Sequence, residues 1–194
     1  MNKTVIDLLR HGEPEGGRMY RGGGTDHKLS QLGWAQMDDS LEPVNAEWFA
    51  IVSSPMLRCK EYAEQLSLNK RIPLDIREDL REAGYGNWEG QTPQQLLEAD
   101  EEAYWQFFAD PVNCRPSNSE DLNFFTQRIA NVLQQVLDEY QGRHILLVSH
   151  LAVTRAIIAT VLRLPLASQE LIDMPFAGKL RLIQDRKGLR ILLF

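Results

Sequence analysis

Several features that mark whole classes of protein are scarce or missing in this sequence. Among its 194 residues there are only two cysteines, Cys59 and Cys114, too few for a disulfide framework and in no spacing that metal sites use. We therefore expect both thiols to be reduced, as is usual in the cytoplasm. The chain also has no run of about 18 apolar residues, which excludes a membrane-spanning helix.

Basic charge is in short supply as well. Lysine and arginine number 21 against 27 aspartates and glutamates, for a net charge of −6. Nucleic acids and anionic membranes bind best to a basic protein surface, so this charge balance argues against both as partners. A small anionic substrate remains compatible, provided that a few arginines converge. Strand-like sequence begins by Thr4 with only Lys3 basic before it, so we expect no leader peptide and a cytoplasmic enzyme.

What the chain does have is the composition of an ordinary globular protein, 43% hydrophobic and 25% charged,. Its length suits a single domain over residues 1–194, at most with an inserted cap. A helical region at approximately 91–142 is the candidate for that cap. No internal repeat or interdomain linker is visible.

The segment Thr4–Gly12, TVIDLLRHG, runs from an apolar strand into Arg-His-Gly. Such a strand is typical of one buried on both faces, ending where open α/β folds bind their ligands. His11 would lie at that edge beside Arg10, and Gly12 would leave room for a bulky group to approach the imidazole. An imidazole next to a guanidinium indicates a nucleophile or acid–base group facing an anion such as phosphate. A surface histidine beside a solvated arginine fits these three residues equally well.

A glycine-rich loop follows His11. Its glycines favour tight turns and close approach of the backbone to a ligand, but their spacing matches no nucleotide-binding P-loop. Arg21 could reach the same anion as Arg10, whereas Arg18 fits better as a solubilising residue. Ser30 predicts the cap of a helix over about 31–41. Leu32, Ala35 and Gln36 follow helical spacing there.

A second buried strand, Trp48–Ser53, leads into Ser54-Pro55. This pair predicts a helix start, with a cap residue and proline at the first helical position. Arg58 lies at the end of that first turn, where a positive charge opposes the helix dipole. An anion held between the guanidinium and the free helix N–H groups would explain the position. The alternative is an exposed arginine offset by Glu61.

The middle of the chain predicts one strand and two helices. Pro73–Ile76 is a short strand, followed by a loop rich in glycine and aromatic residues. That loop carries Glu82 and Glu89, which are either candidates for proton transfer or surface carboxylates. Thr92-Pro93-Gln94-Gln95 predicts a capping box that opens a helix to about Phe108. Ser117-x-x-Glu120 predicts a second box and a helix to about Tyr140, ended by Gly142. That second helix has one apolar face, assigned to the core: Leu122, Phe125, Ile129, Val132, Leu133, Val136 and Leu137.

The strand pattern returns at His144–Ser149, and His150 follows it as His11 follows the first strand. A helix over 151–164 comes next, Met174–Gly178 is a loop, and 179–194 predicts a hairpin of two strands. Strands that alternate with helices indicate an α/β fold. We predict a three-layer α/β/α sandwich with a mostly parallel central sheet.

Two strands thus bring a histidine to one edge, and a third brings Arg58 through Ser-Ser-Pro-x-x-Arg. The motifs that carry this pattern are LLRHGE at 8–13, TDHKLSQLG at 25–33, SSPMLRC at 53–59, LREAGYGNWEG at 80–90 and VSHLAVTR at 148–155. Together they resemble the histidine phosphatase superfamily, the phosphoglycerate-mutase-like enzymes. They extend over most of the chain in the expected order.

This resemblance implies a phosphomonoesterase that needs no metal or other cofactor and acts on a small-molecule phosphate ester. His11 would be the nucleophile and carry the phosphoryl group as phosphohistidine. The phosphoryl oxygens would be bound by Arg10, Arg58 and His150, and Glu82 would be the proton donor and acceptor. Further substrate contacts are expected at Gly12, Arg21 and Gly22, with Glu13 left open. The protein would be a monomer or a homodimer.

Longer segments narrow the resemblance. YRGGGTDHKLSQLGWAQM, SSPMLRC and WQFFADP are similar to the α-ribazole phosphatase group, which removes the 5′-phosphate of a cobalamin nucleotide-loop precursor. Two departures stand out. Leu151-Ala152 follow His150 where the family usually has glycines, and Pro116–Glu120 replaces a Pro-Gly-Gly-Glu stretch.

Two alternatives remain from the sequence. The chain could be a phosphoglycerate mutase-type phosphotransferase, but Gly16-Gly17-Arg18 lacks the asparagine that mutases usually carry there. It could also be a catalytically idle protein that binds phosphorylated partners. An idle relative commonly loses a site residue, whereas His11, Glu82 and His150 are all present.

Overall fold

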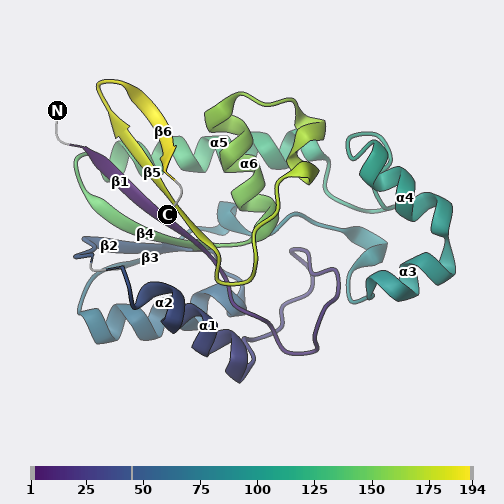
Figure 1. Cartoon of the computed structure of the whole chain (residues 1–194), viewed down its shortest axis with the longest axis horizontal. Helices are drawn as coiled ribbons and strands as arrows, with labels where there is room; N and C mark the ends of the chain where they lie inside the picture. Colours follow the sequence, from purple (N-terminus) through teal and green to yellow (C-terminus); the bar gives the residue numbers. More distant parts are fainter. Residues whose placement is uncertain (1–2, 45, 193–194) are drawn as a thin grey trace.

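The computed structural model describes residues 3–44 and 46–192. Its centre is a six-stranded sheet in the order β3-β2-β4-β1-β5-β6 (Figure 1). Four neighbouring strands run parallel: β3 (Leu74–Ile76), β2 (Ala50–Ser53), β4 (His144–Ser149) and β1 (Thr4–Arg10). Strand β5 (Lys179–Asp185) pairs antiparallel with β1, and β6 (Gly188–Leu192) pairs antiparallel with β5 to form a hairpin. The predicted mostly parallel sheet is confirmed; residues 193–194 of the predicted hairpin lie outside the described residues.

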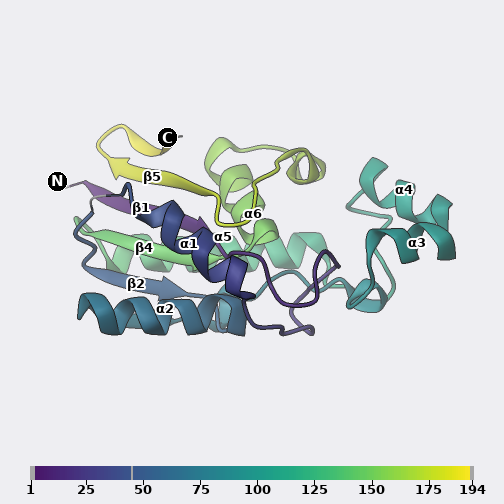
Figure 2. The same cartoon turned by 60° about the horizontal axis from the view of Figure 1, so that its bottom comes forward.

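Helices cover both faces of the sheet, which makes the three predicted layers (Figure 2). One face carries α1 (Gln31–Leu41) and α2 (Leu57–Lys70). The other carries α5 (Leu122–Glu139) and α6 (Leu151–Leu162). Within β4, Ile145 and Leu147 pack toward α5 and α6, while Leu146 and Val148 pack toward α1 and α2. Because both faces are covered, this strand is apolar without alternation.

The predicted apolar face of α5 is confirmed, since all of its seven residues are buried. The predicted face of α1 is only partly correct. Ser30 caps this helix as expected by accepting a hydrogen bond from the Gly33 amide. The buried side, however, is formed by Gly33, Met37 and Leu41, and Leu32 is 55% exposed.

The predicted start of α2 at Ser54-Pro55 is wrong. The helix begins at Leu57, after Met56, whose side chain makes no capping bond. Asp26, from the glycine-rich loop, instead accepts a hydrogen bond from the Leu57 amide at 2.8 Å. A carboxylate remote in sequence thus satisfies a donor that local pattern assigns to Ser54.

The predicted single helix from Pro93 to about Phe108 is also wrong. The Thr92–Gln95 capping box forms, but the helix divides at Asp100 into α3 (Pro93–Ala99) and α4 (Glu101–Ala109). Asp100 has extended backbone and caps α4 through the Ala103 amide. Aspartate competes with the helix by bonding nearby amides, so a new helix starts at this point.

The second predicted capping box, Ser117-x-x-Glu120, does not form. Asp121 caps α5 by accepting from the amides of Asn123 and Phe124. The Glu120 carboxylate is bound instead by Arg128 and by the Gly84 amide, two groups outside the predicted box.

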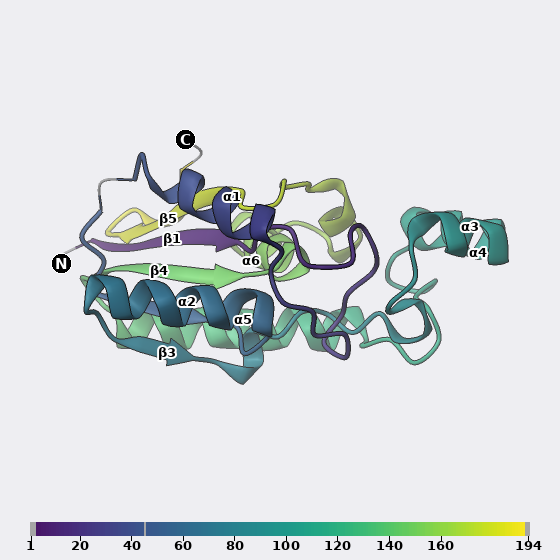
Figure 3. The ribbon, with the colours of Figure 1, turned by 90° about the horizontal axis from the view of Figure 1, so that it is seen from below.

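Helices α3 and α4 stand away from the sandwich (Figure 3). Buried aromatic residues attach them to the body, with Phe107 packing against Tyr85 and Trp88. Short 3₁₀ segments complete the fold: η1 (Glu78–Leu80), η2 (Gly86–Trp88) and η3 (Leu166–Leu171). Within the described ranges no helix is long and apolar enough to span a membrane.

Candidate active site

The carboxyl ends of three parallel strands meet at one edge of the sheet. Arg10 at the end of β1 lies beside Ser149 of β4, and Ser53 at the end of β2 pairs with Val148. The residues that follow these strands therefore lie close together. The structure brings His11 and His150 to the same place, as the sequence predicts.

The His11 imidazole is buried, with 5% of the residue exposed. Its Nδ1 lies 2.7 Å from the carbonyl oxygen of Gly12. A carbonyl can only accept, so Nδ1 carries the proton and Nε2 keeps a free lone pair. Burial, with the positive charges of Arg58 and Arg10, lowers the pKa of His11 well below its ordinary value. The ring is thus held neutral.

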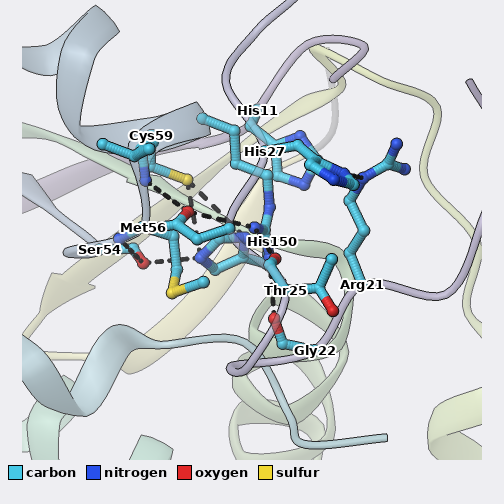
Figure 4. A network of polar contacts seen from close by, with 12 residues as sticks. His11, Arg21, Gly22, Thr25, His27, Ser54, Met56, Cys59 and His150 are labelled. Atoms are coloured by element: carbon cyan, nitrogen blue, oxygen red, sulfur yellow. Dashed lines mark hydrogen bonds and ion pairs between the residues drawn. The ribbon is translucent and has the colours of Figure 1, made fainter. Parts of the chain in front are cut away.

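His150 faces His11 across the site. The two ring centroids are 5.2 Å apart with planes inclined at 65°. The Nε2 atom of His150 lies 2.6 Å from the Ser54 hydroxyl (Figure 4). Burial and the charge of Arg58 lower the pKa of His150 well below its ordinary value too. Two neutral rings therefore lie side by side in a place with little solvent.

Arg58 is fully buried in the first turn of α2. Its Nη1 donates to the Thr25 carbonyl at 3.0 Å and lies 3.7 Å from Asp26. The alternative of an exposed arginine offset by Glu61 is wrong, because Glu61 pairs with Lys28. Among the described residues, Arg58 Nε is buried without a hydrogen-bond partner.

Arg10 has the same kind of open donor. Its Nη1 donates to the Met174 carbonyl and its guanidinium lies over the Phe176 ring. Within the part of the chain that the structure describes, Arg10 Nε is also buried without a partner. Leaving buried cationic N–H groups unpaired is costly. Two such donors beside one neutral imidazole form a site for an anion.

Glu82 contributes a carboxyl group to this site, with 6% of the residue exposed. Its oxygens accept from the amides of Ala83 at 3.0 Å and Ala152 at 3.3 Å. Burial raises the pKa of Glu82, while Arg58, these two amides and Arg10 oppose the rise. The Leu151-Ala152 departure is therefore a direct neighbour of the site, since the first turn of α6 contacts this carboxyl.

Glu89, the other candidate for proton transfer, holds two loops together. Its carboxylate accepts from the Gly24 amide, the Thr25 hydroxyl and the Tyr85 amide. A carbon added at Gly22 would lie 2.0 Å from Glu89 Oε1 and 2.7 Å from the Ala83 carbonyl oxygen, so a larger residue at this position would displace Glu89. The Gly22 carbonyl lies 3.5 Å from Arg58 Nη2, which connects the same loop to the site.

The reason inferred for Gly12 is not the one the structure supports. A carbon added at Gly12 would lie 2.1 Å from the carbonyl oxygen of Gly33. The space beside Gly12 is thus filled by backbone rather than left for a ligand. Arg21 is buried, and it donates through Nε to His27 and through Nη2 to the Glu15 carbonyl. Arg18 is exposed, which agrees with its solubilising interpretation.

Sequence reasoning missed three neighbours of the paired rings. The sequence predicts Ser54 as a helix cap, although the Ser-Ser-Pro-x-x-Arg motif that contains it also brings Arg58 to this edge of the sheet. Cys59 lies with Sγ 3.7 Å from His150 Nε2 and 3.4 Å from the Ser149 carbonyl. Phe176 lies 5.8 Å from the His11 ring between centroids, and no local pattern marks it.

A pocket of about 410 Å³ adjoins the site through Glu82. Four charged side chains in or next to η1 and α5 line much of it: Glu78, Arg81, Glu120 and Arg128. Across residues 3–44 and 46–192, no three His, Cys, Asp or Glu side chains gather as metal ligands would.

Comparisons with known proteins show what this chain is similar to. The family model described as histidine phosphatase superfamily (branch 1) matches residues 6–194. The uncharacterized phosphatase PhoE of Bacillus subtilis is 31% identical over 160 residues, covering 81% of this chain and 77% of the relative. The adenosylcobalamin/alpha-ribazole phosphatase of Salmonella typhimurium is 29% identical over 165 residues, covering 83% and 81%. The solved structure of Bacillus stearothermophilus YhfR has a TM-score of 0.88 and 26% identity, with 98% of this chain and 96% of that chain covered.

Proposed function

Because the chain belongs to the histidine phosphatase superfamily (branch 1), we propose that it hydrolyses a small phosphate monoester through a phosphohistidine on His11. One observation carries the proposal. A neutral imidazole with a free Nε2 lies beside Arg10 and Arg58, whose buried Nε atoms have no partner among the described residues. A phosphoryl group supplies the missing acceptor oxygens.

In the first step His11 Nε2 attacks phosphorus in line with the ester oxygen. The N–P bond forms as the O–P bond breaks, and the Gly12 carbonyl holds the proton on Nδ1,. Arg10, Arg58 and His150 bind the equatorial oxygens, where negative charge gathers in the transition state. Fixed donors in a buried site stabilise that charge without having to reorient.

Glu82 handles the protons. Its raised pKa keeps it protonated at a pH where an ordinary glutamate is ionised, so it can give a proton to the leaving alkoxide. The resulting carboxylate then takes a proton from the water that attacks the phosphohistidine, and the N–P bond breaks to release phosphate and free His11. General acid–base catalysis of this kind contributes about 10²–10⁴-fold.

For the substrate, we propose α-ribazole 5′-phosphate. Support comes from the resemblance of three segments to that phosphatase group and from the 29% identity with the Salmonella relative. The pocket beside Glu82 offers space for the organic part of an ester, since the leaving group must lie on the side of the acid. A panel of phosphate esters, with 3-phosphoglycerate plus a bisphosphoglycerate primer among them, tests this choice by released phosphate. Fast isomerisation of phosphoglycerate would favour the mutase-type alternative.

A trapping experiment tests the chemistry itself. Wild-type protein is mixed with a ³²P-labelled ester in excess EDTA and quenched in alkali, where phosphohistidine survives. Label should remain on the protein and be absent from His11→Ala. His144→Gln is the matched control, since His144 begins the same strand that ends beside His150. Released phosphate without trapped label in any quench, or equal label on His11→Ala, would reject the mechanism.

A further inference from the structure

The loop Met174–Gly178 contacts both ends of the Arg10-His11 pair. It connects η3 to β5 and returns to the point where β1 ends (Figure 1). The Ala177 amide donates to the His11 carbonyl at 3.1 Å, and the Arg10 amide donates to the Gly178 carbonyl at 2.9 Å. Together with the bond from Arg10 Nη1 to the Met174 carbonyl, these contacts make the loop a wall of the site.

Phe176 contacts the two site residues through its ring. The Arg10 Cζ atom lies 4.4 Å from the ring centroid. The His11 and Phe176 centroids are 5.8 Å apart with planes inclined at 41°. A desolvated arginine is stabilised more by an aromatic face than an exposed arginine is. The buried Nε shows that the Arg10 guanidinium is partly desolvated.

The backbone of this loop is unusual where it places the ring. Ala177 has φ +53° and is buried, in the left-handed region that residues with a side chain seldom adopt. Arg71 and Arg163 share this conformation, but both follow a helix, where it is common,. Asn118 shares it too, and asparagine adopts it more readily than alanine does. Ala177 follows none, and its amide is held by the His11 carbonyl. Such backbone tends to occur where a functional site requires it.

We propose that Phe176 is a positioning residue for Arg10, an inference that rests on the proposed function. The ring fixes one face of the guanidinium and the Met174 carbonyl fixes Nη1. The guanidinium is then restrained in both tilt and rotation. Its remaining N–H groups, including the buried Nε, are left for the phosphoryl oxygens that His11 brings into the site. Without the ring, Arg10 would keep its charge but lose its orientation.

The test compares Phe176→Leu with two other variants. Phe176→Tyr keeps an aromatic face. Phe49→Leu removes an equivalent contact elsewhere, since Arg143 Cζ lies 4.3 Å from the Phe49 ring centroid. Each variant is assayed for inhibition by inorganic vanadate and phosphate against p-nitrophenyl phosphate, for KM and kcat, and for its thermal midpoint. We expect Phe176→Leu to weaken vanadate inhibition about tenfold, Phe176→Tyr to stay close to wild type, and Phe49→Leu to leave inhibition unchanged.

A double-mutant cycle adds a readout that simple packing does not move. In an Arg10→Lys background, Phe176→Leu should add little further loss of vanadate binding, because lysine has no planar group for the ring to orient. Full additivity would overturn the proposal. Unchanged vanadate inhibition in Phe176→Leu would overturn it as well. That result would do so even if the thermal midpoint falls, or if kcat falls to an extent that depends on the leaving group of the ester. If wild type cleaves no ester, the proposed function fails. Phosphate and vanadate binding, measured by calorimetry, then still decides whether Phe176 orients Arg10.

Discussion

At the scale of single residues, burial shifts the pKa values of His11 and Glu82 in opposite directions. In the proposed mechanism, His11 has to be neutral to attack and Glu82 has to be protonated to donate. With ordinary pKa values of 6.5 and 4.5 these two states scarcely coexist. Burial lowers the first pKa and raises the second. The required pair of states therefore extends over a range of pH that unperturbed side chains would not share.

A pH profile tests whether Glu82 is the proton donor. For an alkyl phosphate, kcat/KM should fall as pH rises through the raised pKa of Glu82, since the carboxyl then loses the proton it donates. Glu82→Gln should lose that alkaline limb and react about 10²–10⁴-fold more slowly. The limb that belongs to the ester's own ionisation stays in both profiles. An unchanged alkaline limb in Glu82→Gln would assign the proton to another group.

Ser54 and Ser53 offer a matched pair beside the second histidine. The Ser54 hydroxyl accepts from the Met56 amide and lies 2.6 Å from His150 Nε2, whereas the Ser53 hydroxyl donates to the Ser54 carbonyl. Both are fully buried. Ser54→Ala should lower kcat/KM about tenfold, the effect of one buried hydrogen bond, and shift the ¹⁵N resonances of His150. Ser53→Ala should leave both readouts near wild type. Equal losses of kcat/KM in the two variants would mean that Ser54 acts through packing alone.

At the scale of elements, α4 shows how one helix divides adjacent residues between core and solvent. Phe107 is 1% exposed and Phe108 is 40% exposed. The first joins the aromatic contacts that attach α3 and α4 to Tyr85 and Trp88. The second packs mainly on its own helix, against Tyr104, Trp105 and Phe107. The attachment of both helices thus depends on the buried ring.

Phe107→Ala should lower the free energy of unfolding by about 3–5 kcal/mol, since it leaves a cavity under the two helices. Phe108→Ala should cost less than about 1 kcal/mol, because little buried area is lost. Urea denaturation measures both. Similar values for the two variants would show that α3 and α4 are attached some other way.

At the scale of the whole molecule, a single buried carboxylate joins four segments of the chain. Asp7 in β1 accepts from Trp48 Nε1, His144 Nε2 and Arg181 Nε. Burial alone would raise the pKa of Asp7, but the hydrogen bonds from His144, Arg181 and Trp48 outweigh it and lower the pKa to about 2. Asp7 lies three residues before Arg10 in β1, and its hydrogen bonds connect β1 to β4 and β5.

Because the folded pKa of Asp7 is below its ordinary value of 3.8, its contribution is complete above that value and is lost as pH falls toward 2. Asp7→Asn should therefore lower the free energy of unfolding by about 2 kcal/mol near neutral pH. The gap from wild type should narrow in acid. Urea midpoints at about pH 7, 5 and 3 measure this trend. Asp39→Asn, at an exposed aspartate of α1, is the control with little expected effect. A gap that does not change with pH would exclude the charge of Asp7 as its source.

Some features could be read from the sequence because neighbouring residues determine them. The strands, the apolar face of α5 and the Thr92 capping box depend on spacing within one segment, so their patterns are visible locally. The meeting of His11 and His150 also followed, since parallel strands end at one edge. Recognition of the family added the places of Arg58 and Glu82 through motifs rather than through periodicity.

What only the tertiary structure decided are the contacts between segments far apart in the chain. Asp26 caps α2 in place of Ser54, the Gly33 backbone fills the space beside Gly12, and Phe176 lies on Arg10. None of these leaves a local pattern, because each is a choice among hydrogen-bond or packing partners that the folded chain brings into reach. The sequence by itself therefore determined the strands, most of the helices and the sheet edge at which the two histidines meet. The fold decided how each side chain at that edge is held.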